Sequence, residues 1–398
     1  MIDIRFVVPV LIQIRLICYK ETAFTAFARK ALIVPTVYTA LTNTQRGHFD
    51  GIGPIGFVWA VTLFVACLKS IDLGFTPRHK IRYIGPSRQR DKESVQDIDR
   101  DLGWRGFFEL LTKYVTLRGI GWEWGSTLDT LPPVYREKFG RRSILEAFKH
   151  QFISTVSVGV LTYAMDNDDS LAQALGYERT WLAEYVSDVV QTIALASAAW
   201  SGLSLGYHYL AATVYAYSRA TSQSFDPERW PALLDDPLQM HSVHDFWTNK
   251  WHVIFKRQFI MCGYKPVVAV CHRIGIKGDL ARLLGVQGAF FISALLHEYG
   301  IRNALNNVHH PDTYPSLVFF QLSAIAIALE MSFERFTGRK VGGSIGRTWA
   351  WLFLLVTGVP MMRHWMHGGR LGYIAPPRLW TKRKLLIPFA FMAPSQEV

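Results

Sequence analysis

Charged residues and cysteines are both scarce in this chain of 398 residues. Only 19% of the residues are Asp, Glu, Lys or Arg, whereas 50% are hydrophobic, and this balance argues against a soluble globular protein. The four cysteines include no CxxC pair, so they predict neither a disulfide framework nor a zinc-finger motif. The sequence also lacks internal repeats and low-complexity tracts. These absences favour a helical membrane protein.

The net charge of +12 would by itself fit a protein that binds nucleic acid. The basic residues, however, lie in loops beside apolar segments, as at 78–92 and 378–384. Lys and Arg that flank membrane spans explain this placement better, and attraction of an anionic cosubstrate is a second use for them. We therefore expect membrane lipids as partners and no nucleic acid.

The apolar residues gather in blocks of about the length that crosses a bilayer. We predict an all-α, multi-pass transmembrane helical bundle that forms one domain, residues 1–398, with about eight membrane segments. Residues 4–19 and 23–42 either cross the membrane or lie partly in its interface, and the other segments are 53–71, 144–165, 182–217, 281–300, 315–334 and 349–365. The run 182–217 fits either one long tilted helix or two helices with a break near Ser201 and Gly202. A further short helix is expected at 265–277.

One of these spans, 281–300, ends in two ionisable residues. No charged side chain occurs between Leu283 and Leu296, and His297 and Glu298 follow directly. Ionisable groups are costly in or beside an apolar span, so they indicate function by default. A single histidine at the end of an apolar helix is nevertheless often a structural residue. His297 is our candidate for the centre of the chemistry.

No metal site is expected from the sequence. The segment HEYGI is not an HExxH motif, because Ile301 stands where the second histidine would be. His364 and His367 are close in sequence, but no carboxylate or cysteine nearby completes a ligand set. We also expect no bound cofactor.

Residues 241–260 divide into two faces when they are placed on a helix. Trp247, Trp251, Ile254, Phe255 and Gln258 share one face, and Asp245, Asn249, His252 and Lys256 share the opposite face. One interpretation is an amphipathic helix that lies on the bilayer surface. In the other interpretation, Asn249 and His252 face a membrane-embedded reaction chamber, and Lys250, Lys256 and Arg257 attract an anionic cosubstrate. The helical pattern alone does not choose between them.

A neutral, buried imidazole is a good general base. It can take the proton of an alcohol while the alcohol oxygen attacks a thioester, and an Asn or a second His can then donate a hydrogen bond to the oxyanion. A coenzyme A thioester suits this arrangement, because its phosphates fit a basic mouth and its acyl group fits an apolar centre. No covalent enzyme intermediate is required.

The segment FWTNKWH at 246–252, followed by LLHEYG at 295–300, resembles the membrane-bound O-acyltransferase superfamily and within it the wax synthase-like enzymes. The lead-in RWPALLDDP at 229–237 is also similar. RGIGWEW at 118–124 resembles an element of a fungal branch whose members include O-acetyltransferases acting on terpenoids and other secondary metabolites. The resemblance implies a tunnel through the membrane that acyl-CoA enters from the cytosolic side and an apolar alcohol from the lipid side.

Carried over residue by residue, the resemblance implies that His297 is the catalytic base and that His252 orients the reactants or binds the oxyanion, with Asn249 in support. Asn249 falls where relatives usually carry Asp. The catalytic core is expected at 225–364. Substrate and coenzyme A contacts are expected from Trp247, Trp251, Lys250, Lys256, Arg257, Glu298, Arg118 and Trp122. For Arg118 and Trp122, an interfacial turn with Trp anchors is an equal alternative.

The expected function is transfer of an acetyl group from acetyl-CoA to the hydroxyl of a lipophilic, terpenoid-type acceptor in the endoplasmic reticulum or another endomembrane. A long-chain wax ester synthase, using fatty acyl-CoA and a fatty alcohol, is the enzyme alternative, because nothing in the sequence determines acyl length. The non-enzymatic alternative is a transporter in which His297 and Glu298 relay protons. The sequence predicts no oligomeric state.

Overall fold

The computed structural model describes residues 5–44, 53–78, 103–104, 107, 110–111, 133–166, 181–304 and 314–368. Within these ranges the chain is helical and contains no strand, so the predicted all-α class is confirmed. Five helices are long and apolar enough to cross a membrane. They are α4 (Gly53–Phe75), α9 (Trp181–Ala220), α13 (Gly278–Ala304), α14 (Pro315–Thr337) and α15 (Gly343–Arg363). The protein is therefore an integral membrane protein.

The predicted count of about eight segments exceeds these five because four other helices fall short in length or in hydropathy. The N-terminal apolar residues form α1 (Val7–Ile17), α2 (Ala23–Ala31) and α3 (Ile33–Thr44), each too short to span alone. α7 (Phe139–Asp166) is long enough, but its first turns carry Arg141, Arg142, Glu146 and Lys149. The run at 182–217 is one unbroken helix, so the alternative with a break is wrong.

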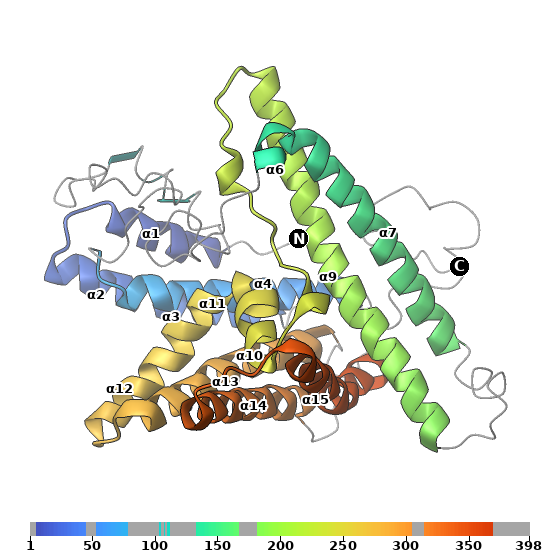
Figure 1. Ribbon diagram of the computed structural model, residues 1–398. Coiled ribbons are helices and arrows are strands. Elements are labelled where there is room, and N and C mark those ends of the chain that lie inside the picture. Colours follow the sequence, from blue (N-terminus) through green and yellow to red (C-terminus); the bar gives the residue numbers. More distant parts are fainter. Residues whose placement is uncertain are drawn as a thin grey trace.

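The helices form two groups (Figure 1). α13, α14 and α15 lie side by side, and α4 packs against α13 with α1, α2 and α3 against it. α7 and α9 form a long pair, and α15 joins this pair to the rest through α9. The largest cluster of buried apolar side chains lies where α13, α14 and α15 meet the segment after residue 240.

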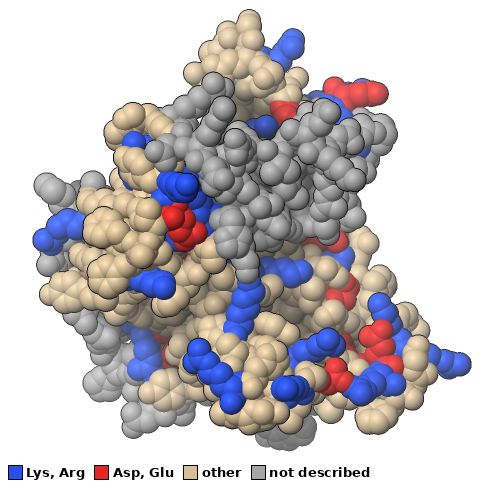
Figure 2. All heavy atoms as spheres, turned by 90° about the vertical axis from the view of Figure 1, so that its left-hand side faces the viewer, with Lys and Arg blue, Asp and Glu red and all other residues tan. Residues whose placement is uncertain are grey.

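Both ends of α14 carry residues that are typical of helix ends. Pro315 occupies the first turn, where its missing N–H costs no hydrogen bond. Gly338 ends the helix with a φ of +69°, a left-handed conformation that glycine adopts without strain. Arg273, Arg282 and Arg335 stand at the exposed ends of α12 (Lys265–Arg273), α13 and α14. Figure 2 shows the left-hand side of the molecule in Figure 1, and Lys and Arg gather along the lower edge of this face. Such a placement is expected for residues that flank membrane spans.

The regular helix predicted for 241–260 is wrong. The segment is instead a series of short turns: α10 (Val243–Asp245), the π-helix η5 (Phe246–Trp251), the 3-10 turn η6 (His252–Ile254), α11 (Lys256–Phe259) and the π-helix η7 (Ile260–Tyr264). Tertiary packing overrides the regular periodicity, because Trp247, Ile254 and Gln258 are all buried. The predicted division into faces still holds in part, since Asn249 and Lys256 are exposed.

Candidate active site

His297 lies in the second half of α13, where its ring is held by its own helix. Its Nδ1 atom is 2.8 Å from the carbonyl oxygen of Ser293, one turn earlier. A carbonyl oxygen can only accept a hydrogen bond, so Nδ1 carries the proton and donates it. The second ring nitrogen, Nε2, is then the one with the lone pair. The local geometry therefore sets the tautomer that a general base needs.

Two aromatic rings from other elements enclose the His297 imidazole. The ring centroid of Phe320, on α14, is 4.5 Å away, and that of Trp365, in the π-helix η8 (His364–Gly368), is 5.7 Å away. Both rings are nearly parallel to the imidazole, at 30° and 19°. The Trp365 indole is itself fixed, because its Nε1 donates a hydrogen bond of 3.1 Å to Ser316 Oγ. This apolar enclosure restricts the approach of water to the imidazole.

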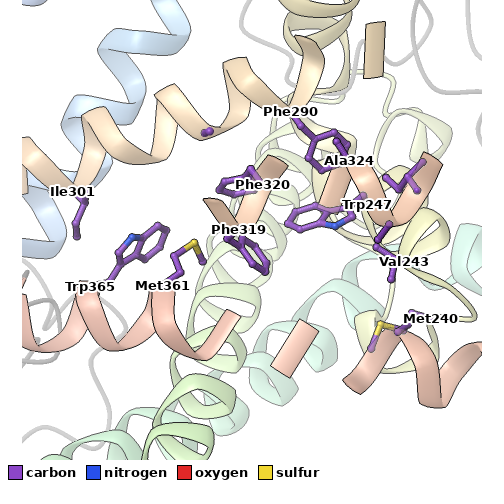
Figure 3. Packing of buried hydrophobic residues seen from close by; sticks show 14 residues of the cluster. Met240, Val243, Trp247, Phe290, Ile301, Phe319, Phe320, Ala324, Met361 and Trp365 are labelled. Atoms are coloured by element: carbon purple, nitrogen blue, oxygen red, sulfur yellow. The ribbon is translucent and has the colours of Figure 1, made fainter. Parts of the chain in front are cut away.

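Trp247, in the upstream motif FWTNKWH, packs against the aromatic rings that surround His297. Its ring, which is only 4% exposed, packs against Phe290, Phe319 and Phe320, with centroids 5.6, 5.8 and 5.4 Å away. Figure 3 shows Trp247 close to Phe319 and Phe320 within this buried cluster. The two sequence motifs thus meet across one ring, that of Phe320, which also stacks on His297. Sequence reasoning missed Phe320 and Trp365, and no motif pointed to them.

A buried carboxylate holds the start of the upstream motif in place. Glu330 on α14 accepts hydrogen bonds from the backbone N–H groups of Val243 and His244, each 2.9 Å long, and from Trp349 Nε1 at 2.8 Å. The residue is 7% exposed. The negative charge also lies at the N-terminus of α10, where it is electrostatically favoured. A signal for Glu330 was present in the sequence, because an ionisable residue within an apolar span is costly.

Arg257 anchors the other end of the motif segment to α4. Its guanidinium contacts the Asp72 carboxylate through two bonds, Nε to Oδ2 at 2.5 Å and Nη2 to Oδ1 at 2.9 Å. Thr76 Oγ1 donates to the same Oδ1 at 2.6 Å. The Arg257 and Asp72 side chains are 11% and 8% exposed. This buried pair fits a positioning role better than the predicted attraction of an anionic cosubstrate.

The two lysines of the motif segment differ in exposure. The Lys250 side chain is only 12% exposed and forms an ion pair with Asp235, whose side chain is 65% exposed. Lys256 is exposed, and desolvation of its ammonium group by neighbouring protein lowers its pKa. Both therefore remain predictions as contacts for a coenzyme A phosphate.

Glu298 turns toward its own helix. It is 6% exposed, and its Oε1 accepts a hydrogen bond of 3.1 Å from Arg302 Nε. The Arg302 guanidinium lies 4.6 Å from the centre of the Tyr314 ring, a cation–π contact. Glu298 thus orders the end of α13, and its predicted contact with substrate stays a prediction.

The partners predicted for His297 are only partly placed. Asn249 is exposed and its Nδ2 donates to Asp245 Oδ1 at 2.8 Å, so the structure does not bring it together with the buried aromatic group around His297. Trp251 stacks on Phe246 at 6.0 Å and 14°. The side chain of His252 lies outside the described residues, as do Arg118 and Trp122. The shared chamber between His252 and His297 therefore stays a prediction.

Comparison with known proteins gives a consistent result. Residues 230–322 match the model of the membrane bound O-acyl transferase family. The chain is 29% identical over 124 residues to the "Probable long-chain-alcohol O-fatty-acyltransferase 8" of Arabidopsis thaliana, a match that covers 31% of this chain and 36% of that protein. It is 25% identical over 330 residues to the "Acetyltransferase ple2" of Rhodocybe pseudopiperita, covering 80% of this chain and 77% of the relative.

A second fungal relative is the "Acetyltransferase eriL" of Hericium erinaceus, which is 28% identical over 171 residues, 42% of each chain. The matches to the plant enzymes span little more than a third of those proteins' length. No solved structure matches. The matched residues 230–322 contain both Trp247 and His297 and lie inside the expected core at 225–364. The predicted resemblance of this chain to the wax synthase-like branch of the membrane bound O-acyl transferase family is confirmed.

Proposed function

We propose that this protein is a membrane O-acyltransferase that moves an acetyl group from acetyl-CoA to the hydroxyl of a lipophilic, terpenoid-type acceptor. One observation carries the proposal. The Ser293 carbonyl fixes the proton of His297 on Nδ1, and the aromatic enclosure of Phe320 and Trp365 keeps the ring in place. A histidine held in this way is preorganised to accept a proton at Nε2.

In the proposed reaction, His297 Nε2 takes the proton of the acceptor hydroxyl while the hydroxyl oxygen attacks the thioester carbonyl carbon. The C=O electron pair moves to oxygen and forms a tetrahedral oxyanion. When the intermediate collapses, the C–S bond breaks and the coenzyme A sulfur leaves with the pair. The imidazolium returns its proton to this thiolate, so the enzyme is regenerated and an ester and free coenzyme A are released.

Stabilisation of the oxyanion is assigned to His252, because an imidazole N–H can donate to developing negative charge. The exposed Asn249, which donates to Asp245, is given no part in this step. Lys250 and Lys256 would attract the coenzyme A phosphates, Lys256 from an exposed position and Lys250 from beside its partner Asp235. Arg257 is assigned a positioning role through its pair with Asp72. Location in the endoplasmic reticulum or another endomembrane belongs to the same proposal.

The choice of acetyl over a long acyl chain rests on the relatives. The match to the fungal acetyltransferase ple2 extends over 80% of this chain, whereas the match to the plant long-chain-alcohol enzyme covers 31%. A wax ester synthase remains the second candidate, because the plant relatives carry that activity in their names. The two differ in donor and acceptor, so one assay separates them.

To test the proposal, the purified protein is given four substrate pairs: acetyl-CoA or palmitoyl-CoA, each with a terpene alcohol or a fatty alcohol. Free coenzyme A and ester product are then measured. We expect product with acetyl-CoA and the terpene alcohol. Replacement of His297 with Ala should lower turnover by about 10²–10⁴-fold, while His272→Ala, an exposed control on α12, should not change it.

Near-normal turnover of a folded His297→Ala variant would overturn the assignment of the base. Product only with palmitoyl-CoA and the fatty alcohol would favour the wax ester synthase. Proton-coupled solute movement without any release of coenzyme A would support the transporter alternative and remove the proposed function.

A further inference from the structure

Three potential metal ligands meet between α7 and α9, and none of them belongs to the His297 site described above. Glu146 and His150 are four residues apart on α7, so they share one face of that helix. His208 faces them from α9. The nearest ligand atoms of the three side chains all lie within 4.8 Å of one another. The two helices run side by side over most of their length (Figure 1).

Both histidines are buried without a complete set of hydrogen bonds. His150 and His208 are 5% and 4% exposed. The Nδ1 atoms of both rings are buried and have no hydrogen-bond partner among the described residues. A buried polar atom without a partner is costly, and a bound ion is one of the few ways to satisfy it. Because ligand atoms of the two rings also lie within 4.8 Å of each other, one ligand could bind both.

The surroundings fix the two rings in a parallel arrangement. The imidazoles of His150 and His208 are stacked, with centroids 5.8 Å apart and planes at 13°. Trp200 on α9 packs edge-on against His150, at 5.1 Å and 90°. Glu146 completes the set at the more exposed side, where one of its oxygens also pairs with Lys149 at 3.0 Å. The cluster is thus an ordered group on two packed helices.

The ligand chemistry selects among cations. Imidazole nitrogen suits zinc, copper, iron and nickel, whereas calcium and magnesium prefer sites built from oxygen alone. Two histidines and one carboxylate form a common zinc set. Zinc–ligand bonds of about 2.1 Å place the donors of a tetrahedral site about 3.4 Å apart, so small side-chain rotations from the present separations would close the site.

We propose that Glu146, His150 and His208 bind one zinc ion that clamps α7 to α9. Trp200 belongs to the cluster formed with Leu233, Leu234 and Ile254, and Trp251 packs against that cluster. Through Trp200, the clamp supports the segment that leads into and follows the FWTNKWH motif. The three ligands are not part of the His297 site, and the ion's proposed role is to join the two helices. The sequence reasoning that expected no metal considered only histidines close together in the chain.

The experiment measures zinc content by inductively coupled plasma mass spectrometry on full-length protein. The protein is purified in detergent through a tag without histidine, incubated with zinc and dialysed. We expect one zinc ion per wild-type chain. His208→Asn removes a ligand while keeping a polar side chain, and it should lower zinc affinity by at least about 10–100-fold, the effect seen when even outer partners of ligands are lost. His272→Asn, at an exposed position on α12, is the matched control and should keep its zinc.

A second variant separates metal loss from misfolding. His208→Cys replaces nitrogen with a thiolate, another zinc ligand, so it should retain the metal. When loaded with cobalt instead of zinc, it should show a sulfur-to-cobalt charge-transfer absorption that the wild-type protein lacks. A chelator should lower the Tm of the wild-type protein but not that of His208→Asn, because only a protein that binds the ion is stabilised by it.

Wild-type protein without zinc after loading, or equal zinc in the wild-type and His208→Asn proteins, would overturn the proposal. Absence of the charge-transfer band in a folded, cobalt-loaded His208→Cys variant would also overturn it. Because metal content is measured without substrate, these outcomes do not depend on acyl transfer by His297.

Discussion

Replacing Glu330 with Ala should destabilise the protein and displace the FWTNKWH segment from the aromatic group around His297. Glu330 is the common acceptor for the backbone N–H groups of Val243 and His244 and for the Trp349 indole. The residue is 7% exposed, so water does not readily replace it. Alanine would leave three donors without their acceptor.

The magnitude follows from the three bonds. Hydrogen bonds to a charged group contribute roughly 1.5–3 kcal/mol each, but some of this returns as the donors find other acceptors or water. Losing one partner of a buried charged network typically costs roughly 3–5 kcal/mol, and we expect a loss within that range. If the whole chain unfolds cooperatively, this corresponds to a fall in Tm of about 4–6 °C, because the entropy of unfolding scales with chain length.

Thermal unfolding of the purified protein in detergent measures the effect, and coenzyme A release measures the functional consequence. Glu334→Ala is the matched control, since Glu334 lies one turn further along α14, is exposed and only approaches Lys340 at 3.9 Å. Its loss should cost less than about 1 kcal/mol. Glu330→Gln keeps one acceptor oxygen, and its Tm should fall between those of the wild type and Glu330→Ala.

An unchanged Tm for Glu330→Ala would refute the reasoning, because it would mean that the three donors are satisfied without the carboxylate. Equal losses for Glu330→Ala and Glu334→Ala would show that the effect comes from charge on the helix and not from the hydrogen bonds. A destabilised variant with normal turnover per folded molecule would restrict Glu330 to stability.

Two further predictions concern the packing of the motif segment. Asp72→Ala and Arg257→Ala should each lower the free energy of unfolding by roughly 3–5 kcal/mol. In a double-mutant cycle measured by chemical denaturation, the double variant should lose clearly less than the sum of the two single losses. Additive losses would argue against an interaction between Asp72 and Arg257. Gly263→Ala should destabilise by about 1–3 kcal/mol, because its Cβ would lie 2.3 Å from the Gly288 carbonyl oxygen, on the backbone of α13. The Cβ of Gly202→Ala, on α9, would meet no atom within 4 Å, so this variant should instead stabilise the protein by about 0.5–1 kcal/mol. Thermal unfolding compares the two variants, and a lower Tm for Gly202→Ala than for Gly263→Ala would contradict this packing.

Local sequence patterns determined much of the architecture. Long apolar blocks predicted α4, α9, α13, α14 and α15, because only a continuous run of apolar side chains is stable across a membrane as a helix. The same reasoning drew attention to His297, since an ionisable residue beside such a run is costly and therefore informative. The chemical character of the motif residues also indicated the resemblance to membrane bound O-acyl transferases that residues 230–322 show.

The tertiary structure alone decided how these elements meet. Glu330 bonds Val243, 87 residues away, and Arg257 bonds Asp72, 185 residues away; neither contact follows from spacing along the chain. The π-helical turn at 246–251 could not be predicted from the sequence either, because the packing of Trp247 against α13 and α14 overrides regular helical periodicity. The pairing of His150 with His208 depends on which faces of α7 and α9 pack together. Local patterns specify helices and the cost of burying each group, whereas the partner that offsets this cost comes from another helix and is known only once the helices pack.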